Sequence, residues 1–401
     1  MTNPYAEIFR AKGAKGFAAA GFVARLPVAM STIAIVAMLS QTHGEYWLAG
    51  AVSATFALTN ALLAPQISRL VDSYGQSRVL LPATTVSILA FASLLVATHY
   101  AWPTPYLFAF AFAAATMPSI PAMVRARWTE LYRDTPKLGT AFAFESVLDE
   151  LMYITGSVLA VSLSVTFFPE AGLLTSVIFL TVGSIAFIAQ RSTEPRIQPA
   201  AMTGGRSAIT LVPVQFITVA LIAVGAIFGT AEVTVIAVTR ELGQPAAASF
   251  VLGGYAVGSL IVGLIYGAMR FTLPLSRQFA IAIAVAATTT IPLLFVTNIP
   301  MLAIALFASG VAISPTFITA FGLIERLVPP AKLTEGITWV MTGIGIGMAA
   351  GSFASGWMID QYGAINGFWV SVAAGAVGLT TALLGQRSLS ESRRNPVPAL
   401  A

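Results

Sequence analysis

The chain has 401 residues, of which 57% are hydrophobic and only 9% are charged. Soluble domains carry about 25% charged residues, so this composition excludes an ordinary soluble protein and indicates a polytopic membrane protein. Cysteine is absent, which excludes disulfides, thiolate metal sites and cysteine nucleophiles. The net charge of +5 would suit nucleic-acid binding, unless membrane topology accounts for the cations.

Long apolar segments follow one another along the whole chain. Residues 1–15 form a short basic lead, and the apolar run after them is too long for the core of a signal peptide. We therefore expect it to be retained as the first membrane span, since a span needs about 20 apolar residues. The same rule predicts about twelve spanning helices in all. They are expected at 16–40, 47–69, 77–98, 104–124, 138–166, 170–190, 211–238, 246–268, 276–297, 300–324, 333–358 and 366–386.

The cations indicate the orientation of these helices. If the N-terminus lies inside the cell, all Lys and Arg residues except Arg25 and Arg240 fall at the cytoplasmic side. This asymmetry follows the positive-inside rule and predicts that both termini are cytoplasmic. It also accounts for the basic net charge, so no nucleic-acid partner is expected.

The longest polar connection divides the chain into two similar halves. We predict an N-terminal six-helix bundle over 1–190, a flexible cytoplasmic linker over 191–210 and a C-terminal six-helix bundle over 211–401. The predicted fold class is therefore an all-α polytopic membrane protein whose twelve transmembrane helices form two pseudo-symmetric bundles.

Small residues recur every four positions on two predicted helices of the second half. Gly343, Gly347 and Gly351 line one face of the eleventh helix, and Gly225 and Gly229 mark the seventh. Such stripes allow helix backbones to approach closely in lipid, and we expect them to serve packing.

Charged residues inside predicted spans are the first candidates for function. An unpaired Arg25 at about 15 Å from the inner end of the first helix would cost at least ~2.5–3.5 kcal/mol, so it needs a carboxylate or a water-filled cavity. The fifth helix offers Glu145, Asp149 and Glu150 at a similar depth. Glu145 and Asp149 share a helix face, whereas Glu150 points about 100° away. Two interpretations remain open: a permanent ion pair that fixes helix packing, or a site for proton coupling or substrate.

A second membrane acid, Glu232, lies in the outer part of the seventh helix. It is a functional candidate by default, and the alternative is a carboxyl that pairs with Arg240 at the outer interface. Arg125 and Arg127 end the fourth helix on the inside. They are expected to anchor that helix end, or to pair with Asp72 across the cytoplasmic surface as gate partners.

The loop between the second and third predicted helices has acid, glycine and base at fixed offsets. Asp72 is placed to pair with a cation or a helix N-terminus, and Gly75 can adopt positive φ where the chain reverses. The stretch resembles the corresponding loop of the major facilitator superfamily, G-x-L-a-D-r-x-G-r-k-x-x-L. Ser68 stands at the first glycine of that motif, and Arg78 follows one place after the usual basic pair. This resemblance implies a cytoplasmic gate loop.

Three further stretches add to the resemblance. They are R-L-P from Arg25, E-S-V-L-D-E from Glu145 and F-G-T-A-E-V from Phe228, which are similar to the twelve-helix efflux branch of bacterial proton-coupled antiporters. In the fifth-helix antiporter signature, Gly156 is followed by Ser157 where the branch has proline. The resemblance implies two six-helix bundles, a midplane cavity and alternating access.

The expected function is proton-coupled efflux of a small amphipathic or hydrophobic molecule by a monomer in the bacterial inner membrane. Protons, membrane lipids and the small-molecule substrate are the expected partners. No phosphate loop, nucleotide motif or metal-ligand spacing appears, so no cofactor and no enzymatic activity are expected, and the proton gradient supplies the energy. Two alternatives stay open: a proton-coupled importer or uniporter of a sugar or other metabolite, and a non-transporting membrane receptor.

Overall fold

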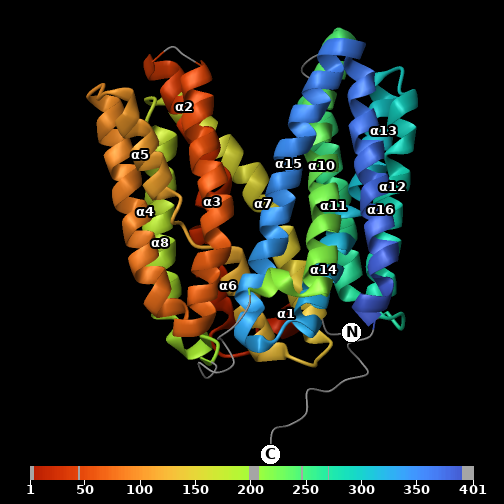
Figure 1. Cartoon of the computed structure of the whole chain (residues 1–401), viewed down its shortest axis with the longest axis horizontal. Helices are drawn as coiled ribbons and strands as arrows, with labels where there is room; N and C mark the ends of the chain where they lie inside the picture. Colours follow the sequence, from red (N-terminus) through yellow and green to blue (C-terminus); the bar gives the residue numbers. More distant parts are fainter. Residues whose placement is uncertain (1–3, 44–45, 198–206, 245–246, 270, 391–401) are drawn as a thin grey trace, which may run out of the picture. The chain divides into compact units, whose positions relative to one another are not determined.

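The computed structural model describes residues 4–43, 46–197, 207–244, 247–269 and 271–390 (Figure 1). Helices make up nearly all of these residues, and the chain divides into two compact units. Unit 1 comprises residues 1–138 and 148–205, and unit 2 comprises residues 139–147 and 206–401. The short stretch 139–147 belongs to a helix whose remainder lies in unit 1.

Unit 1 contains the first half of the helices. They are α1 (Pro4–Ile8), α2 (Ala14–His43), α3 (Tyr46–Tyr74), α4 (Gln76–His99), α5 (Thr104–Ala114), α6 (Ile120–Tyr132), α7 (Lys137–Thr166), α8 (Ala171–Ala189) and the 3-10 turn η1 (Arg191–Thr193). Within this unit α2 packs along α8 and α3, and α4 packs between α5 and α8. The core is formed almost entirely by apolar side chains of these helices.

Unit 2 contains the remaining helices. They are η2 (Ala208–Thr210), α10 (Val212–Glu241), α11 (Ala247–Ala268), α12 (Leu275–Thr289), η3 (Ile291–Phe295), α13 (Ile299–Gly310), α14 (Ile313–Leu327), η4 (Pro330–Lys332), α15 (Leu333–Tyr362), η5 (Ala364–Gly367) and α16 (Phe368–Ser390). Here α10 lies between α15 and α16 and contacts both along its length.

The predicted all-helical membrane fold is confirmed. Eleven of the described helices, or closely joined helix pairs, are long and apolar enough to cross a membrane. Helices suit this environment because they satisfy every backbone polar group internally where lipid offers no hydrogen bonds. The remaining predicted span is the pair α5 and α6.

The predicted single helix over 104–124 is wrong in detail. The chain leaves the helix after Ala114, starts again at Ile120 and continues to Tyr132. Pro118 and Pro121 lie at this break, and proline lacks the N–H that would continue the helical hydrogen bonds.

The predicted linker over 191–210 falls partly outside the described residues, which stop at 197 and resume at 207. Both described ends contain short 3-10 turns, η1 and η2, and both contact the unit next to them.

The glycine stripes of unit 2 bring α10 and α15 into backbone contact (Figure 1). A Cβ added at Gly347 would lie 2.0 Å from the carbonyl oxygen of Ile222, and one at Gly229 would lie 2.0 Å from that of Met348. No side chain larger than hydrogen fits at these distances, so the stripes determine how closely this helix pair packs.

We expect the substitution Gly347→Ala to lower the free energy of unfolding by about 1–3 kcal/mol, because the new methyl group would overlap a backbone carbonyl on the neighbouring helix. Gly345→Ala is the matched control, since a Cβ at Gly345 meets no atom within 4 Å. Thermal unfolding in detergent micelles measures both variants. Equal stability of the two would show that α10 and α15 are not in direct contact.

Candidate functional site

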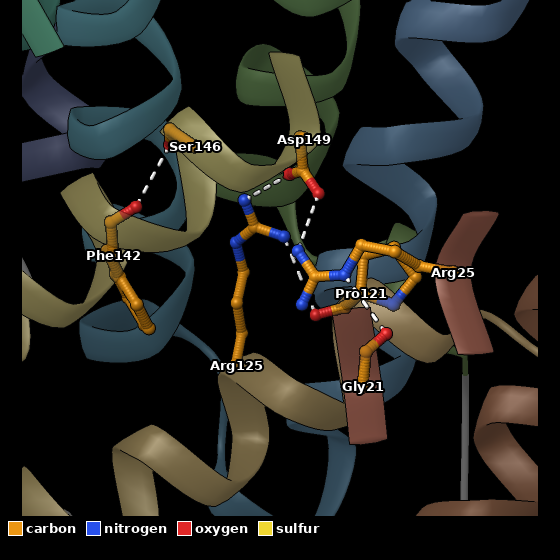
Figure 2. Close-up of polar contacts among 7 residues, drawn as sticks. All are labelled: Gly21, Arg25, Pro121, Arg125, Phe142, Ser146 and Asp149. Atoms are coloured by element: carbon orange, nitrogen blue, oxygen red, sulfur yellow. Dashed lines mark hydrogen bonds and ion pairs between the residues drawn. The ribbon is translucent and has the colours of Figure 1, made fainter. Parts of the chain in front are cut away.

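A buried aspartate bridges two buried arginines in unit 1 (Figure 2). Asp149 lies on α7, Arg25 on α2 and Arg125 on α6. Arg25 donates from Nη1 to Oδ1 of Asp149 at 2.9 Å, and Arg125 donates from Nη2 to Oδ2 at 2.6 Å. Each carboxylate oxygen therefore receives one charge-assisted hydrogen bond, and the aspartate joins three helices.

The helices that carry the arginines also fix their side chains. Nε of Arg25 donates to the carbonyl of Gly21 at 3.3 Å, and Nη1 of Arg125 contacts the carbonyl of Pro121 at 3.5 Å. Gly21 also permits a close approach of α2 to α6, because a Cβ there would lie 2.4 Å from Val124 Cγ2. A glycine one turn before Arg25 thus lets α6 lie close beside α2.

The cluster lies deep within its helices. Arg25 and Asp149 are each about 16–18 Å along the axis from the predicted cytoplasmic ends of α2 and α7, at 1.5 Å per residue. Both arginine side chains are 0% exposed, and the Asp149 side chain is 11% exposed. Removal of a guanidinium group from water costs several kcal/mol, so these groups need the carboxylate to offset that cost.

Two more acids of α7 are buried. Glu145, one helical turn before Asp149, is 0% exposed, and Glu150 is 9% exposed. Glu145 belongs to the part of α7 that groups with unit 2. Buried acids at these two positions agree with the prediction that all three are embedded, and their role in proton coupling stays a prediction.

The expected carboxylate partner of Arg25 is confirmed and is Asp149. The interpretation of Arg125 as an anchor of the helix end is wrong, because its side chain lies in the core and binds Asp149. The sequence placed Arg125 near a helix end at 124, whereas α6 continues to Tyr132. The longer helix moves Arg125 away from the surface.

Glu232 on α10 is exposed, and within the described residues it has no hydrogen bond or ion pair. The alternative pairing with Arg240 is therefore not formed in this structure. A function for Glu232 in coupling stays a prediction.

The predicted gate loop is a sharp turn between α3 and α4. Gly75 has a φ of 91°, as expected for the residue at which the chain reverses. Ser68 is fully buried on α3, and Asp72 is half-buried near its end. Arg78 is exposed and makes no ion pair with any described residue, and a gating role of this loop stays a prediction.

Arg127 connects this turn to the end of α8, a role that sequence reasoning missed. It donates from Nε to Gln76 Oε1 at 2.8 Å, and from Nη1 to the carbonyl of Gln190 at 2.8 Å and to Thr193 Oγ1 at 2.9 Å. Its guanidinium group also lies 3.8 Å from the ring centroid of Phe187. The predicted pairing of Arg127 with Asp72 is wrong, since every hydrogen bond of Arg127 goes to other groups.

Glu194 is the acid that binds the turn. Its Oε1 accepts from the backbone N–H of Ser77 at 2.8 Å, and its Oε2 accepts from the Ser77 hydroxyl at 2.6 Å. Ser77 is in the first turn of α4, where unsatisfied N–H groups and the helix dipole favour an anion. Gly75 faces the same contact, because a Cβ there would lie 3.2 Å from Glu194 Oε1. The only sequence signal for this contact is that the first turn of α4 contains no acidic residue of its own.

An equivalent contact is present in unit 2. Glu335 on α15 is buried, and its Oε1 accepts from the Ser207 hydroxyl, from the backbone N–H of Ala208 at 3.0 Å and from Trp339 Nε1 at 3.4 Å. A carboxylate therefore holds each described end of the predicted linker onto its own unit.

Comparison with known proteins agrees with this architecture. Residues 217–400 match the model of the Major Facilitator Superfamily. No curated protein matches the sequence of this chain.

Several solved transporters have a similar structure at low sequence identity. A bacterial homologue of the iron transporter ferroportin is 14% identical, with a TM-score of 0.75 over 94% of this chain and 100% of that one. The human organic anion transporter is 13% identical, with a TM-score of 0.70 over 93% and 99% of the two chains. The fucose:proton symporter of E. coli is 14% identical, with a TM-score of 0.67 over 92% and 98%. These likenesses show that the chain has the fold of these transporters, and they do not single out efflux.

We expect Arg25→Ala to lower the free energy of unfolding by about 3–5 kcal/mol, the usual cost when one partner of a buried ion pair is removed. Arg78→Ala is the control, because Arg78 is exposed and unpaired among the described residues, and we expect a change within about 0.5 kcal/mol. Chemical unfolding in micelles followed by tryptophan fluorescence measures both. An Arg25→Ala protein as stable as the control would contradict the buried pair.

We expect Glu194→Ala to destabilise the protein by about 1 kcal/mol, since it removes an acceptor for two groups in the first turn of α4. Hydrogen exchange localises the effect: the Ser77 amide should lose protection while amides in the middle of α4 keep theirs. Glu241→Ala serves as the control, because Glu241 is exposed and makes no hydrogen bond to a described residue. Unchanged protection of Ser77 would rule out the Glu194 cap.

Proposed function

We propose that this protein is a proton-coupled secondary transporter that exports a small amphipathic or hydrophobic molecule by alternating access across the bacterial inner membrane. The observation that carries the proposal is the Asp149 carboxylate, held between two guanidinium groups inside the helices of unit 1. Charged groups at such depth are costly, and transporters use them for coupling ions and substrates. Both termini are cytoplasmic in this proposal, and the protein acts as a monomer.

The chemistry of the cluster suggests how a proton would act. Asp149 forms ion pairs with both Arg25 and Arg125 and thereby joins α2, α6 and α7. A proton on Asp149 would remove its negative charge and weaken both links at once. Glu145, one helical turn earlier on α7, is a second buried acid. Proton uptake would in this way change the relative stability of two helix arrangements, as coupling requires.

Glu232 is the candidate acid of unit 2. Because α10 is a membrane-spanning helix, an exposed and unpaired carboxylate on it is stable only if water reaches it. We propose that Glu232 faces an aqueous path and exchanges protons along it.

Import is the second candidate function. The fold is similar to those of a fucose:proton symporter and a proton:xylose symporter, both of which are named as symporters of sugars. A proton-coupled importer of a sugar or other metabolite would use the same cluster. The direction of flux under an imposed pH gradient distinguishes the two functions.

We expect purified protein in liposomes to move at least one probe when a pH gradient is applied. The probes are ethidium for amphipathic molecules, fluorescein for organic anions, and fucose and xylose for sugars. Asp149→Asn and Glu145→Gln should each lower the proton-driven rate on the order of tenfold, equivalent to about 1.4 kcal/mol in the limiting step. Glu232→Gln should lower it as well.

Glu241→Gln is the matched control, since it neutralises an exposed acid on the same helix as Glu232. Its rate should equal that of the unmodified protein. Undiminished coupling in both Asp149→Asn and Glu145→Gln would remove the cluster from the mechanism, and uptake of a sugar together with protons would replace export by import.

A further inference from the structure

The break between α5 and α6 leaves backbone carbonyls without helical partners inside the fourth span. Residues 115–119 are not helical, and Pro118 and Pro121 cannot donate backbone hydrogen bonds there. Lipid supplies no donors either, so each freed carbonyl needs a donor from a neighbouring helix.

Asn60 on α3 supplies two of these donors. Its Nδ2 donates to the carbonyl of Ala115 at 2.9 Å and to that of Met117 at 3.0 Å. An amide NH₂ has two hydrogens, so the donor capacity of Asn60 is fully used at the break. Ser87 on α4 adds a third bond, from its hydroxyl to the carbonyl of Ala114 at 2.7 Å. The bent segment is thus held on both sides by side chains.

The break lies only a few residues before Arg125. Helix α6 begins at Ile120, and Arg125 is buried in its second turn, where it bonds Asp149 at 2.6 Å. A helix is rigid over two turns, so the position of the break determines where Arg125 meets the carboxylate. The hydrogen bonds of Asn60 therefore influence the contact between Arg125 and Asp149, although Asn60 is not part of that contact.

The corresponding region of unit 2 shows that a broken span does not require this arrangement. There α13 ends at Gly310 and α14 begins at Ile313. Gly310 packs directly on α11, since a Cβ at Gly310 would lie 2.2 Å from the carbonyl of Tyr255, and the hydroxyls of Ser259 and Ser314 bond each other at 2.9 Å.

The two units also differ in the residue that follows the break. Four residues after Pro121 comes Arg125, whereas four residues after Pro315 comes Thr319, which is buried and bonds within its own helix. In the described residues, the wide break held by an asparagine occurs in the unit that contains the Asp149 cluster.

We propose that Asn60 is a positioning residue for the Asp149 cluster: it holds the bent fourth span so that Arg125 provides the second guanidinium to Asp149. Only the expected effect of Asn60 on transport rests on the proposed function. The positioning itself is a property of unit 1 and is testable without any substrate.

A double-mutant cycle in thermal unfolding separates positioning from general support of the fold. We expect Asn60→Ala and Arg125→Gln each to lower the melting temperature in micelles. If Asn60 acts through Arg125, the fall caused by Asn60→Ala should be clearly smaller in the Arg125→Gln background, because the contact it positions is already lost. An equal fall in both backgrounds would overturn the proposal.

Ser53→Ala is the matched control. Ser53 also lies on α3 and donates to a backbone carbonyl of another helix, that of Thr32, at 3.0 Å. Its effect should add to that of Arg125→Gln without coupling. If Asn60→Ala does not yield folded protein, Asn60→Gln keeps both donors on a longer arm and enters the same cycle with the same criterion.

Transport gives an independent readout. In liposomes with a pH gradient and ethidium as the probe, Asn60→Ala should shift the pH dependence of the rate in the same direction as Arg125→Gln, while Ser53→Ala leaves it unchanged. Absence of flux in every variant and in the unmodified protein would reject ethidium export, whereas the unfolding cycle would still decide the role of Asn60. A pH profile that moves with Arg125→Gln and not with Asn60→Ala would count against positioning.

Discussion

The need to neutralise two buried guanidinium groups governs the arrangement of unit 1. Arg25 and Arg125 lie far apart in the chain, and both form ion pairs with Asp149. Because an unpaired charge at this depth is expensive, the two ion pairs of Asp149 hold α2, α6 and α7 together.

Both units use glycines to bring helices close together, and both contain buried polar contacts. In unit 2, α10 and α15 meet backbone to backbone through glycines such as Gly229 and Gly347, with van der Waals contact as the main source of stability. In unit 1, polar side chains hold the helices at defined points: Asp149 in the interior, Asn60 at the broken span and Arg127 at the α3–α4 turn. Glycine contacts occur in unit 1 too, since a Cβ at Gly183 on α8 would lie 2.4 Å from the backbone nitrogen of Ala24 on α2.

Carboxylates also hold the chain segments on either side of the predicted linker. Glu194 caps the start of α4 from the segment that follows α8, and Glu335 binds Ser207 and Ala208 just before α10. Each contact places an anion against backbone N–H groups at the beginning of a helical segment, where the peptide dipoles favour it. The segment that carries Glu194 is thus fixed to unit 1. A change at Glu194 would directly affect the first turn of α4.

The sequence by itself determined the membrane fold and the pairing of Arg25 with an acid of the fifth helix. These features follow from the lengths of the apolar runs, from the positions of glycine and proline, and from the cost of a charge in lipid. All of these are local properties. Only the tertiary structure decided that Asp149 was the partner, that Arg125 shared it, and that Asn60 and Glu194 bound carbonyls and amides far away in the chain. The extension of α6 to Tyr132 and the choice among three neighbouring acids depend on how helices turn and approach one another, and residue spacing does not encode that geometry.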